Sequence, residues 1–267
     1  MIVDFHTHCF PDDLAARAIP RLAEKSSIRA YIDGTVSSLR ASMAAAGIDR
    51  SVMLQIAVKP TQNHTVNTWA IERTEPGIIP FGSVHPRSAD WESELERLAA
   101  AGIRGIKLHP EYQDFFVDDP VAVPIYRACA RLGLCIVFHA GRDPGFRCEA
   151  HCTPQRILRV LDDLPRGRTI LAHMGGLGLW NDVETLLAGT DLLFDTSFCY
   201  EHLPPDDLLR LIRAHGADKI LLGSDSPWES QSQALETIDR IPLTAAERTA
   251  ILGGNAMRLL NQDPAKQ

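Results

Sequence analysis

Two histidines separated by a single residue, His6 and His8, are the residues nearest the start of the chain that could do chemistry. They lie at the end of a short apolar run that begins at Ile2. In an extended strand, side chains repeat every two residues, so both imidazoles project from one face. Paired imidazoles on one rigid strand are suitable ligands for a divalent metal such as Zn²⁺. One such pair is weak evidence, so the interpretation depends on the rest of the chain.

Later apolar runs also end in residues of the ligand type. Taken singly, each has an ordinary explanation: a hydrogen-bonded structural histidine, a solvated lysine or an aspartate that caps a helix. Their recurrence at the ends of successive runs favours a metal site. The residues in question are Lys107, His109, His139, His173 and Asp225, together with His85.

The elements that must position these residues are eight short apolar runs. Most are rich in leucine and β-branched residues and are too short for helices, which is typical of strands buried on both faces. The predicted strands are Ile2–His6, Ser51–Ile56, Ile78–Val84, Gly105–His109, Leu134–His139, Thr169–His173, Leu192–Asp195 and Ile220–Gly223.

Amphipathic stretches lie between these strands, and several stop at a glycine, as helices often do. A capping box, Thr244-Ala-Ala-Glu247, predicts one more helix near the end. The other predicted helices are Thr35–Gly47, Trp91–Gly102, Val121–Gly133, Thr153–Leu164, Asp182–Gly189, Pro205–Gly216 and Gln231–Ile241.

This alternation predicts an α/β chain folded as a (β/α)8 TIM barrel, because eight β-then-α units within about 240 residues match that architecture. Periodicity alone does not exclude an open doubly wound sheet. A dinucleotide-binding sheet would carry Gly-x-Gly-x-x-Gly after its first strand, and none follows His8. We expect one domain over residues 1–267. In a barrel the active site forms at the carboxyl ends of the strands, where the ligand-type residues lie.

Composition excludes several functions. A hydrophobic content of 45% with 23% charged residues allows a large buried core. The net charge of −7 argues against a nucleic-acid partner. No apolar run approaches the roughly 20 residues of a membrane helix, and no leader peptide is visible, so we expect a cytoplasmic protein without a membrane partner. The six cysteines are then expected to be free thiols.

The ordered motifs resemble those of the amidohydrolase superfamily. The matching stretches are DFHTH (4–8), GIKLHP (105–110), FHAG (138–141), LAHMGG (171–176), GSDSPW (223–228) and ILGGNAMRLL (251–260). They run in order over nearly the whole chain. The most similar branch is the amidohydrolase-related family that includes aminocarboxymuconate semialdehyde decarboxylase, whose members are compact barrels. Because strand 1 is predicted to begin at residue 2, we expect a single compact barrel without the added β-sandwich that larger members carry partly before strand 1.

The resemblance implies a role for each matching position. His6, His8 and His139 would be metal ligands, and Asp225 would contact both the metal and its bound water. His173 would bind a second metal or act on the substrate. Lys107 lies on the strand that carries a carboxylated, metal-bridging lysine in binuclear relatives. The decarboxylase branch is mononuclear, so the sequence leaves one or two ions open, with Zn²⁺ or another divalent transition metal such as Mn²⁺ as the cofactor.

This ligand set suits two reactions. A metal held by imidazoles and a carboxylate lowers the pKa of bound water to about 7, and the resulting hydroxide attacks an ester, lactone or amide. Asp225 can take up the proton and return it to a leaving group. We therefore expect a metal-dependent hydrolase. The same site could instead protonate a ring carbon and release CO₂, as a non-oxidative decarboxylase does. A non-catalytic metal-binding module is the third class, which the proton-carrying Asp225 disfavours.

Residues of the loops after the strands should bind the substrate. Arg87 and Arg142 suit bidentate binding of a carboxylate, so we expect a small anionic molecule as the partner. His109 and Trp228 are further candidates for substrate contact. In the loop after strand 5, Cys148, His151 and Cys152 lack a nearby fourth ligand, which disfavours a structural zinc there. The sequence does not decide whether the chain forms a homo-oligomer.

Overall fold

The chain forms eight parallel β-strands with helices between them, and the computed structural model describes residues 1–261. The strands pair in sequence order, in one run from β1 to β3 and another from β4 to β8. Their bounds are β1 Val3–Thr7, β2 Arg50–Leu54, β3 Ile78–Phe81, β4 Gly105–Leu108, β5 Cys135–Phe138, β6 Thr169–Leu171, β7 Leu193–Asp195 and β8 Ile220–Leu221.

Backbone hydrogen bonds join the two runs of strands into a closed barrel. At one seam the Gly82 amide donates to the Gly105 carbonyl at 3.0 Å, and the Lys107 amide donates to the Gly82 carbonyl at 2.8 Å. At the other seam, the Phe5 amide donates to the Leu222 carbonyl at 2.7 Å. Closure leaves no free sheet edge, and the predicted (β/α)8 barrel is confirmed.

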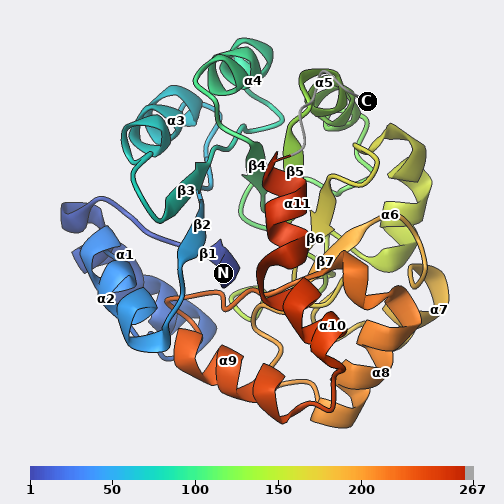
Figure 1. The fold of residues 1–267 in the computed structure, drawn as a ribbon. Helices are drawn as coiled ribbons and strands as arrows, with labels where there is room; N and C mark the ends of the chain where they lie inside the picture. Colours follow the sequence, from blue (N-terminus) through green and yellow to red (C-terminus); the bar gives the residue numbers. More distant parts are fainter. Residues whose placement is uncertain (262–267) are drawn as a thin grey trace.

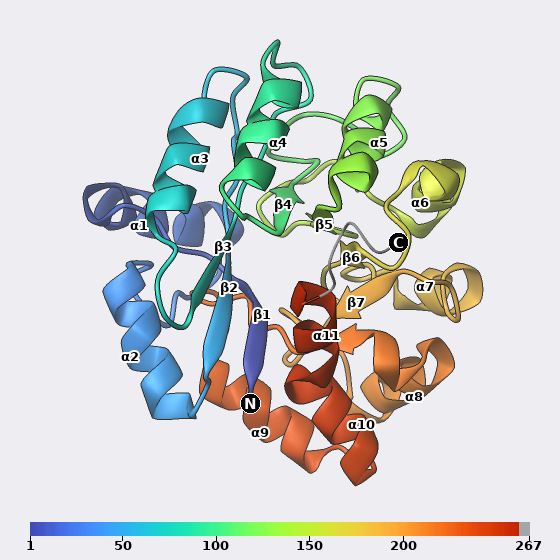
Figure 2. The same ribbon diagram turned by 45° about the horizontal axis from the view of Figure 1, so that its top comes forward.

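The helices lie around the outside of the strands (Figures 1 and 2). Most of them bury apolar side chains against the barrel, as parallel strands with two covered faces require. Their bounds are α1 Asp12–Ser26, α2 Val36–Ala46, α3 Asn63–Glu72, α4 Trp91–Ala100, α5 Val123–Leu132, α6 Pro154–Val160, α7 Trp180–Leu186, α8 Pro205–His215, α9 Gln231–Arg240, α10 Ala245–Thr249 and α11 Asn255–Asn261.

The C-terminal helix α11 closes one end of the barrel. Figure 1 shows it lying across the centre of the ring of helices, in front of the strands. Its Ala256, Leu259 and Leu260 pack with the residues that fill the barrel interior, among them Phe5 and Phe81. Side chains therefore fill the barrel at that end. A functional site is then expected at the opposite end, where the strands have their carboxyl ends.

Every predicted helix forms within a few residues of its expected bounds, and the Thr244–Glu247 capping box precedes α10. Helices α1 and α3 were not predicted. The buried face of α3 is largely polar, because it consists of Asn63, Asn67 and Ala70, so no apolar periodicity marks it. None of the helices between residues 1 and 261 has the length and apolar character that crossing a membrane requires.

Most of the predicted strands extend too far at their carboxyl ends, although those ending at His6 and Asp195 do not. Strand β3 ends at Phe81, so the expectation that His85 closes it is wrong. Strand β6 ends at Leu171, and His173 beyond it has a left-handed backbone with φ of 60°. Asp225, with φ of 65°, lies past β8 in the same conformation. A strand cannot continue through left-handed residues, so these side chains are carried by irregular backbone just beyond the strands.

Candidate metal centre

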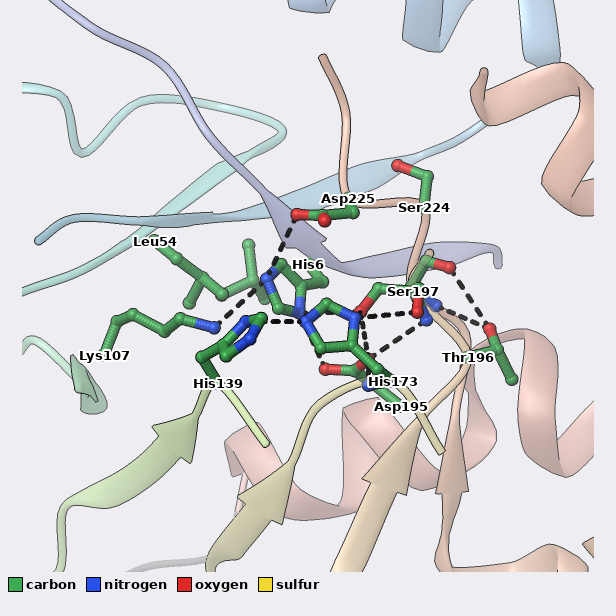
Figure 3. Close-up of polar contacts among 12 residues, drawn as sticks. His6, Leu54, Lys107, His139, His173, Asp195, Thr196, Ser197, Ser224 and Asp225 are labelled. Carbon is green, nitrogen blue, oxygen red and sulfur yellow. Dashed lines mark hydrogen bonds and ion pairs between the residues drawn. The ribbon is translucent and has the colours of Figure 1, made fainter. Parts of the chain in front are cut away.

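The two histidines of the first strand converge with an aspartate that follows the last. The Nε2 atoms of His6 and His8 lie 3.2 Å apart. Oδ1 of Asp225 is 3.4 Å from Nε2 of His6 and 3.2 Å from Nε2 of His8. The two segments meet because the Asp225 amide donates to the His6 carbonyl at 2.8 Å, across the seam that closes the barrel. Figure 3 shows Asp225 above the His6 ring.

The opposite nitrogen of each imidazole is already engaged. Nδ1 of His6 lies 2.8 Å from Oδ2 of Asp195, and Nδ1 of His8 lies 3.0 Å from the carbonyl oxygen of Leu54. Neither oxygen can donate, so each Nδ1 carries the hydrogen when the ring is neutral. The Nε2 lone pairs then face one another and a carboxylate oxygen, an arrangement that a bound cation would stabilise.

These three atoms fit a divalent metal ion. Two ligands bound tetrahedrally at 2.0–2.2 Å lie about 3.4 Å from each other, close to the three separations here. The set of two imidazoles and one carboxylate suits Zn²⁺ or Mn²⁺ better than Ca²⁺, which prefers oxygen. Asp195 and the Leu54 carbonyl would orient the rings from behind, as partners of metal-bound histidines generally do.

Burial and neighbouring charges favour the protonation states that binding needs. Burial, together with the Lys107 charge, lowers the pKa of His6 to about 4, so this ring is neutral near pH 7. Burial alone would raise the pKa of Asp225, but the proximity of the His6 and His8 imidazoles outweighs it and lowers that pKa to about 2. Both groups therefore present free lone pairs at neutral pH.

Lys107 lies inside the same centre. Its Nζ is 3.2 Å from Nε2 of His6, and the side chain is 1% exposed. Burial lowers its pKa to about 8, although Asp195 and Asp225 oppose that change. Figure 3 shows the lysine reaching His6 from β4. The sequence prediction that Lys107 belongs to the centre therefore agrees with its position, while its role stays a prediction.

His139 and His173 form a second group beside the first. Nε2 of His173 lies 2.9 Å from Nδ1 of His139, and Nδ1 of His173 lies 2.9 Å from the Ser197 carbonyl oxygen. The ring centroids of His6 and His173 are 5.5 Å apart. His139 is thus adjacent to the His6–His8–Asp225 set but outside the group of three converging atoms, and its predicted role as a ligand remains a prediction.

His109 stacks on His139 at the mouth of the centre. Their ring centroids are 4.2 Å apart with planes 10° from parallel, and Nε2 of His109 lies 3.2 Å from Oδ2 of Asp143. The ligand atoms of His109, His139 and Asp143 all lie within 4.8 Å of one another. Imidazole lone pairs lie in the ring plane, so two nearly parallel rings at this spacing do not aim at one ion. We therefore place no metal there.

A family model described as amidohydrolase matches residues 3–262. The chain belongs to the amidohydrolase family. A curated relative, the 2-amino-3-carboxymuconate-6-semialdehyde decarboxylase of Dictyostelium discoideum, is 27% identical over 210 residues. That match covers 65% of this chain but only 58% of the relative's length. The resemblance inferred from the sequence motifs is confirmed.

Two solved structures share the barrel over nearly its whole length. The 2,6-dihydroxybenzoate decarboxylase from Rhizobium is 19% identical, with a TM-score of 0.73 and coverage of 97% of this chain and 98% of its own. The 5-carboxyvanillate decarboxylase from Novosphingobium aromaticivorans, solved with manganese and 4-hydroxy-3-methoxy-5-nitrobenzoic acid, is 14% identical. Its TM-score is 0.70, and the coverage is 98% of this chain and 96% of its own. At these identities the structures establish a likeness of fold alone.

Three predicted substrate residues have different surroundings in this amidohydrolase. The Arg87 guanidinium donates to the Asp114 carbonyl and lies 3.5 Å from the Asp114 carboxylate, which ties it to the neighbouring loop. Arg142 is exposed, and Trp228 is half-buried with its amide donating to the Asp225 carbonyl at 2.8 Å. Arg142 therefore remains the better candidate for binding an anion.

The cysteines form no disulfide in the described part of the chain, as expected. Within the Cys148–Cys152 segment, Sγ of Cys148 is 4.0 Å from Nε2 of His151. Nδ1 of His151 lies 3.2 Å from the Pro110 carbonyl, and Cys152 is buried in the apolar core. Among residues 1–261, these three side chains do not form one of the groups whose ligand atoms lie close enough together to hold a metal ion.

Sequence reasoning missed Asp195 and Ser197, which lie directly beneath His6 and His173. Asp195 is the last residue of β7, so the rule that selected the strand-end histidines would have found it. Burial alone would raise the pKa of Asp195, but the charge of His6 and hydrogen bonds from His6 and Ser197 lower it well below the ordinary value. Asp143, which the sequence analysis also missed, lies in the loop after β5 and not at a strand end, so the same rule does not select it.

Proposed function

We propose that this amidohydrolase is a metal-dependent, non-oxidative decarboxylase of a small unsaturated or aromatic carboxylic acid. The observation that carries the proposal is the His6–His8–Asp225 donor set at the carboxyl ends of the strands, in a chain that is similar to several proteins named as decarboxylases. These relatives favour decarboxylation over the ester, lactone or amide hydrolysis that the sequence led us to expect. Hydrolysis by the same centre is the second candidate.

His6, His8 and Asp225 would hold the ion, with Mn²⁺ or Zn²⁺ as the candidates. When bound, the ion would supply positive charge to a carboxylate or oxyanion of the substrate. The chain itself supplies the remaining chemistry. The bond between the ring carbon and the carboxylate breaks, its electron pair stays on the carbon, and CO₂ leaves. That carbon then needs one proton, and the group that delivers it must lie beside the ion.

Asp225 is the best candidate for carrying this proton. It adjoins both histidines through Oδ1, and its side chain is 11% exposed, so its environment is largely closed to water. A carboxylate there can take up a proton as the substrate binds and return it to the carbon from which CO₂ departs. His173, whose ring lies beside His6 and His139, would orient the substrate against the ion.

Product analysis tests the proposal. Protein reloaded with Mn²⁺ or Zn²⁺ is incubated with a panel of ¹³C-carboxyl-labelled hydroxybenzoates and unsaturated dicarboxylates, and ¹³CO₂ is followed by mass spectrometry. Release of ¹³CO₂ that depends on added metal is the expected result. Acid production from lactones without ¹³CO₂ would instead favour the hydrolase. Metal-loaded protein that is inert on both panels would favour a non-catalytic metal-binding module.

A further inference from the structure

Asp195 lies at the centre of a buried hydrogen-bond network beneath the candidate metal centre. Oδ2 is 2.8 Å from Nδ1 of His6. Oδ1 accepts from the His173 amide at 3.2 Å, from the Ser197 amide at 3.0 Å and from the Ser197 hydroxyl. The Asp195 side chain is fully buried. Figure 3 shows the carboxylate below both imidazoles. The Asp195 carboxylate thus contacts the ring of His6 and the backbone amide of His173, two of the predicted functional histidines.

Only one arrangement of hydrogens satisfies this network. The Ser197 hydroxyl donates to Asp195, so its oxygen is free to accept from Nδ1 of His6 at 3.0 Å and from Nδ1 of His173 at 3.1 Å. The Ser197 carbonyl, 2.9 Å from Nδ1 of His173, can only accept. Both rings must therefore carry their hydrogen on Nδ1 and leave Nε2 as a lone pair.

The contact at Nε2 of His6 independently indicates that the hydrogen of this ring is on Nδ1. Lys107 Nζ lies 3.2 Å from Nε2 of His6, and an ammonium group has hydrogens to donate but no lone pair. The Nε2 atom facing it must therefore be an acceptor. If the hydrogen were on Nε2 instead, two donors would meet on one side of the ring, and a lone pair would face a carboxylate at 2.8 Å on the other.

We propose that Asp195 is a positioning residue that sets the tautomer of His6 and, through Ser197, that of His173, so that His6 presents its Nε2 lone pair to the centre and His173 presents its own to Nδ1 of His139. The consequence for metal binding rests on the proposed function, but the tautomers themselves do not. Ordering two rings with one ionised carboxylate also explains why the fold keeps a fully buried aspartate, since buried charges are generally poor sources of stability.

The substitution that tests this inference is Asp195→Asn, which replaces one oxygen by an amide nitrogen and keeps the shape. The remaining oxygen of the introduced side chain can still accept from the His173 and Ser197 amides, which leaves its NH₂ group facing His6. That group donates, so Nδ1 of His6 must become the acceptor and the hydrogen must move to Nε2. The lone pair that would bind the metal is then lost.

Nitrogen NMR of ¹⁵N-histidine-labelled, metal-free protein reads the tautomers directly, without any assumption about activity. We expect Nδ1–H for His6 and His173 in the wild type, and Nε2–H for His6 in Asp195→Asn. Titration with Zn²⁺ should show affinity about 10–100-fold weaker in the variant, as is typical when an outer partner of a histidine ligand is lost. An Nε2–H tautomer at His6 in the wild type would overturn the proposal before any variant is made.

The matched control is Asp143→Asn, the same chemical change at the mouth of the centre. Asp143 contacts His109 and lies 3.9 Å from Nε2 of His139, but it does not contact His6, so the His6 tautomer should stay on Nδ1. Should Asp195→Asn keep the Nδ1–H tautomer, or bind zinc as tightly as Asp143→Asn, the positioning role is wrong. If tautomers shift as expected but no decarboxylation is ever detected, the proposed reaction fails and this inference stands.

Discussion

The ammonium nitrogen of Lys107 lies 3.2 Å from Nε2 of His6, the same atom that faces His8 and Asp225. One lone pair cannot accept a hydrogen bond from Lys107 and bind a metal ion at once. Metal binding must therefore displace the ammonium, neutralise it or convert it to a ligand by carboxylation. Since burial already lowers the Lys107 pKa to about 8, neutralising it costs less than it would for an exposed lysine.

We predict that Lys107→Met binds a single Zn²⁺ or Mn²⁺ ion more tightly than the wild type. Removing a unit charge about 4 Å from a cation relieves several kcal/mol of repulsion at the effective dielectric of a protein site, so affinity should rise at least about tenfold. Calorimetric titration of the metal-free protein measures this, with Lys107→Arg as the control that keeps the charge. A loss of bound metal in Lys107→Met would show instead that Lys107 is a ligand.

The His6–His8 pair should hold most of the metal affinity. We expect His8→Ala to reduce the metal retained per chain after gel filtration severalfold while the fold persists, because His8 lies at the edge of the barrel and contacts Leu54 only through a hydrogen bond. Elemental analysis measures the retained metal. His202→Ala, which removes an exposed histidine in the loop after β7, should leave the stoichiometry unchanged. Equal retention in the two variants would contradict the assignment.

Asp225 should matter for turnover more than for metal retention. Asp225→Asn keeps an oxygen near His6 and His8 but cannot carry a proton as a carboxylate does. On any substrate that the wild type turns over, kcat should fall about 100- to 10,000-fold, the usual range for loss of a general acid–base group. Steady-state kinetics at matched metal content measures the change. A kcat near that of the wild type would exclude Asp225 as the proton carrier.

The sequence was sufficient to predict the position of His6 and His8, because the two-residue repeat of a strand is a local property. Bringing Asp225 to them needed only the barrel, whose first and last strands pair. The orientation of His139 could not be predicted, since it depends on the ring packing among His109, His139 and His173. The left-handed backbone at His173 also has no sequence signal, because non-glycine residues seldom adopt it.

Helix α3 shows a second limit of sequence patterns. Its buried face carries Asn67, which accepts from the Ser83 amide at 2.8 Å and donates to Glu94 at 2.9 Å. Asn63 accepts from the His85 amide at 2.8 Å. These side-chain hydrogen bonds act together with limited apolar packing by Trp69, Ala70 and Ile71 to hold this helix in place. Hydrophobic periodicity alone therefore does not mark the helix.

The two arginines predicted to bind an anionic substrate should behave differently. Arg142→Ala should raise KM for a carboxylate substrate about tenfold, because the variant loses a charge-assisted hydrogen bond worth about 1.5 kcal/mol or more. Arg87→Ala should change KM little, because its guanidinium is engaged by Asp114. Kinetics on a carboxylate and on its neutral amide separate charge recognition from loop support. Equal effects of Arg142→Ala on both compounds would show that Arg142 only supports its loop.

His215, the last residue of α8, should make stability depend on pH. Its Nε2 lies 2.8 Å from the Leu192 carbonyl, its Nδ1 accepts from the Gly189 amide at 3.3 Å, and its ring stacks on Phe194 at 3.8 Å. These contacts suit the neutral ring. Burial, the largest cause, lowers the pKa of His215 from 6.5 to about 4 in the folded protein.

The unfolded chain binds a proton at His215 at a higher pH than the folded protein does. Above pH 6.5 both states are neutral at this residue, so His215 imposes no penalty. Between pH 6.5 and 4 His215 is protonated in the unfolded chain but stays neutral in the folded protein. The free energy of unfolding therefore falls as the pH falls, by up to about 1.4 kcal/mol per pH unit.

His215→Gln should weaken this pH dependence. Urea unfolding of the metal-free protein at pH 7.5 and pH 5 measures it, with His202→Gln as the exposed control. If His215→Gln and His202→Gln lose the same stability between these pH values, the folded-state pKa of His215 is not lowered.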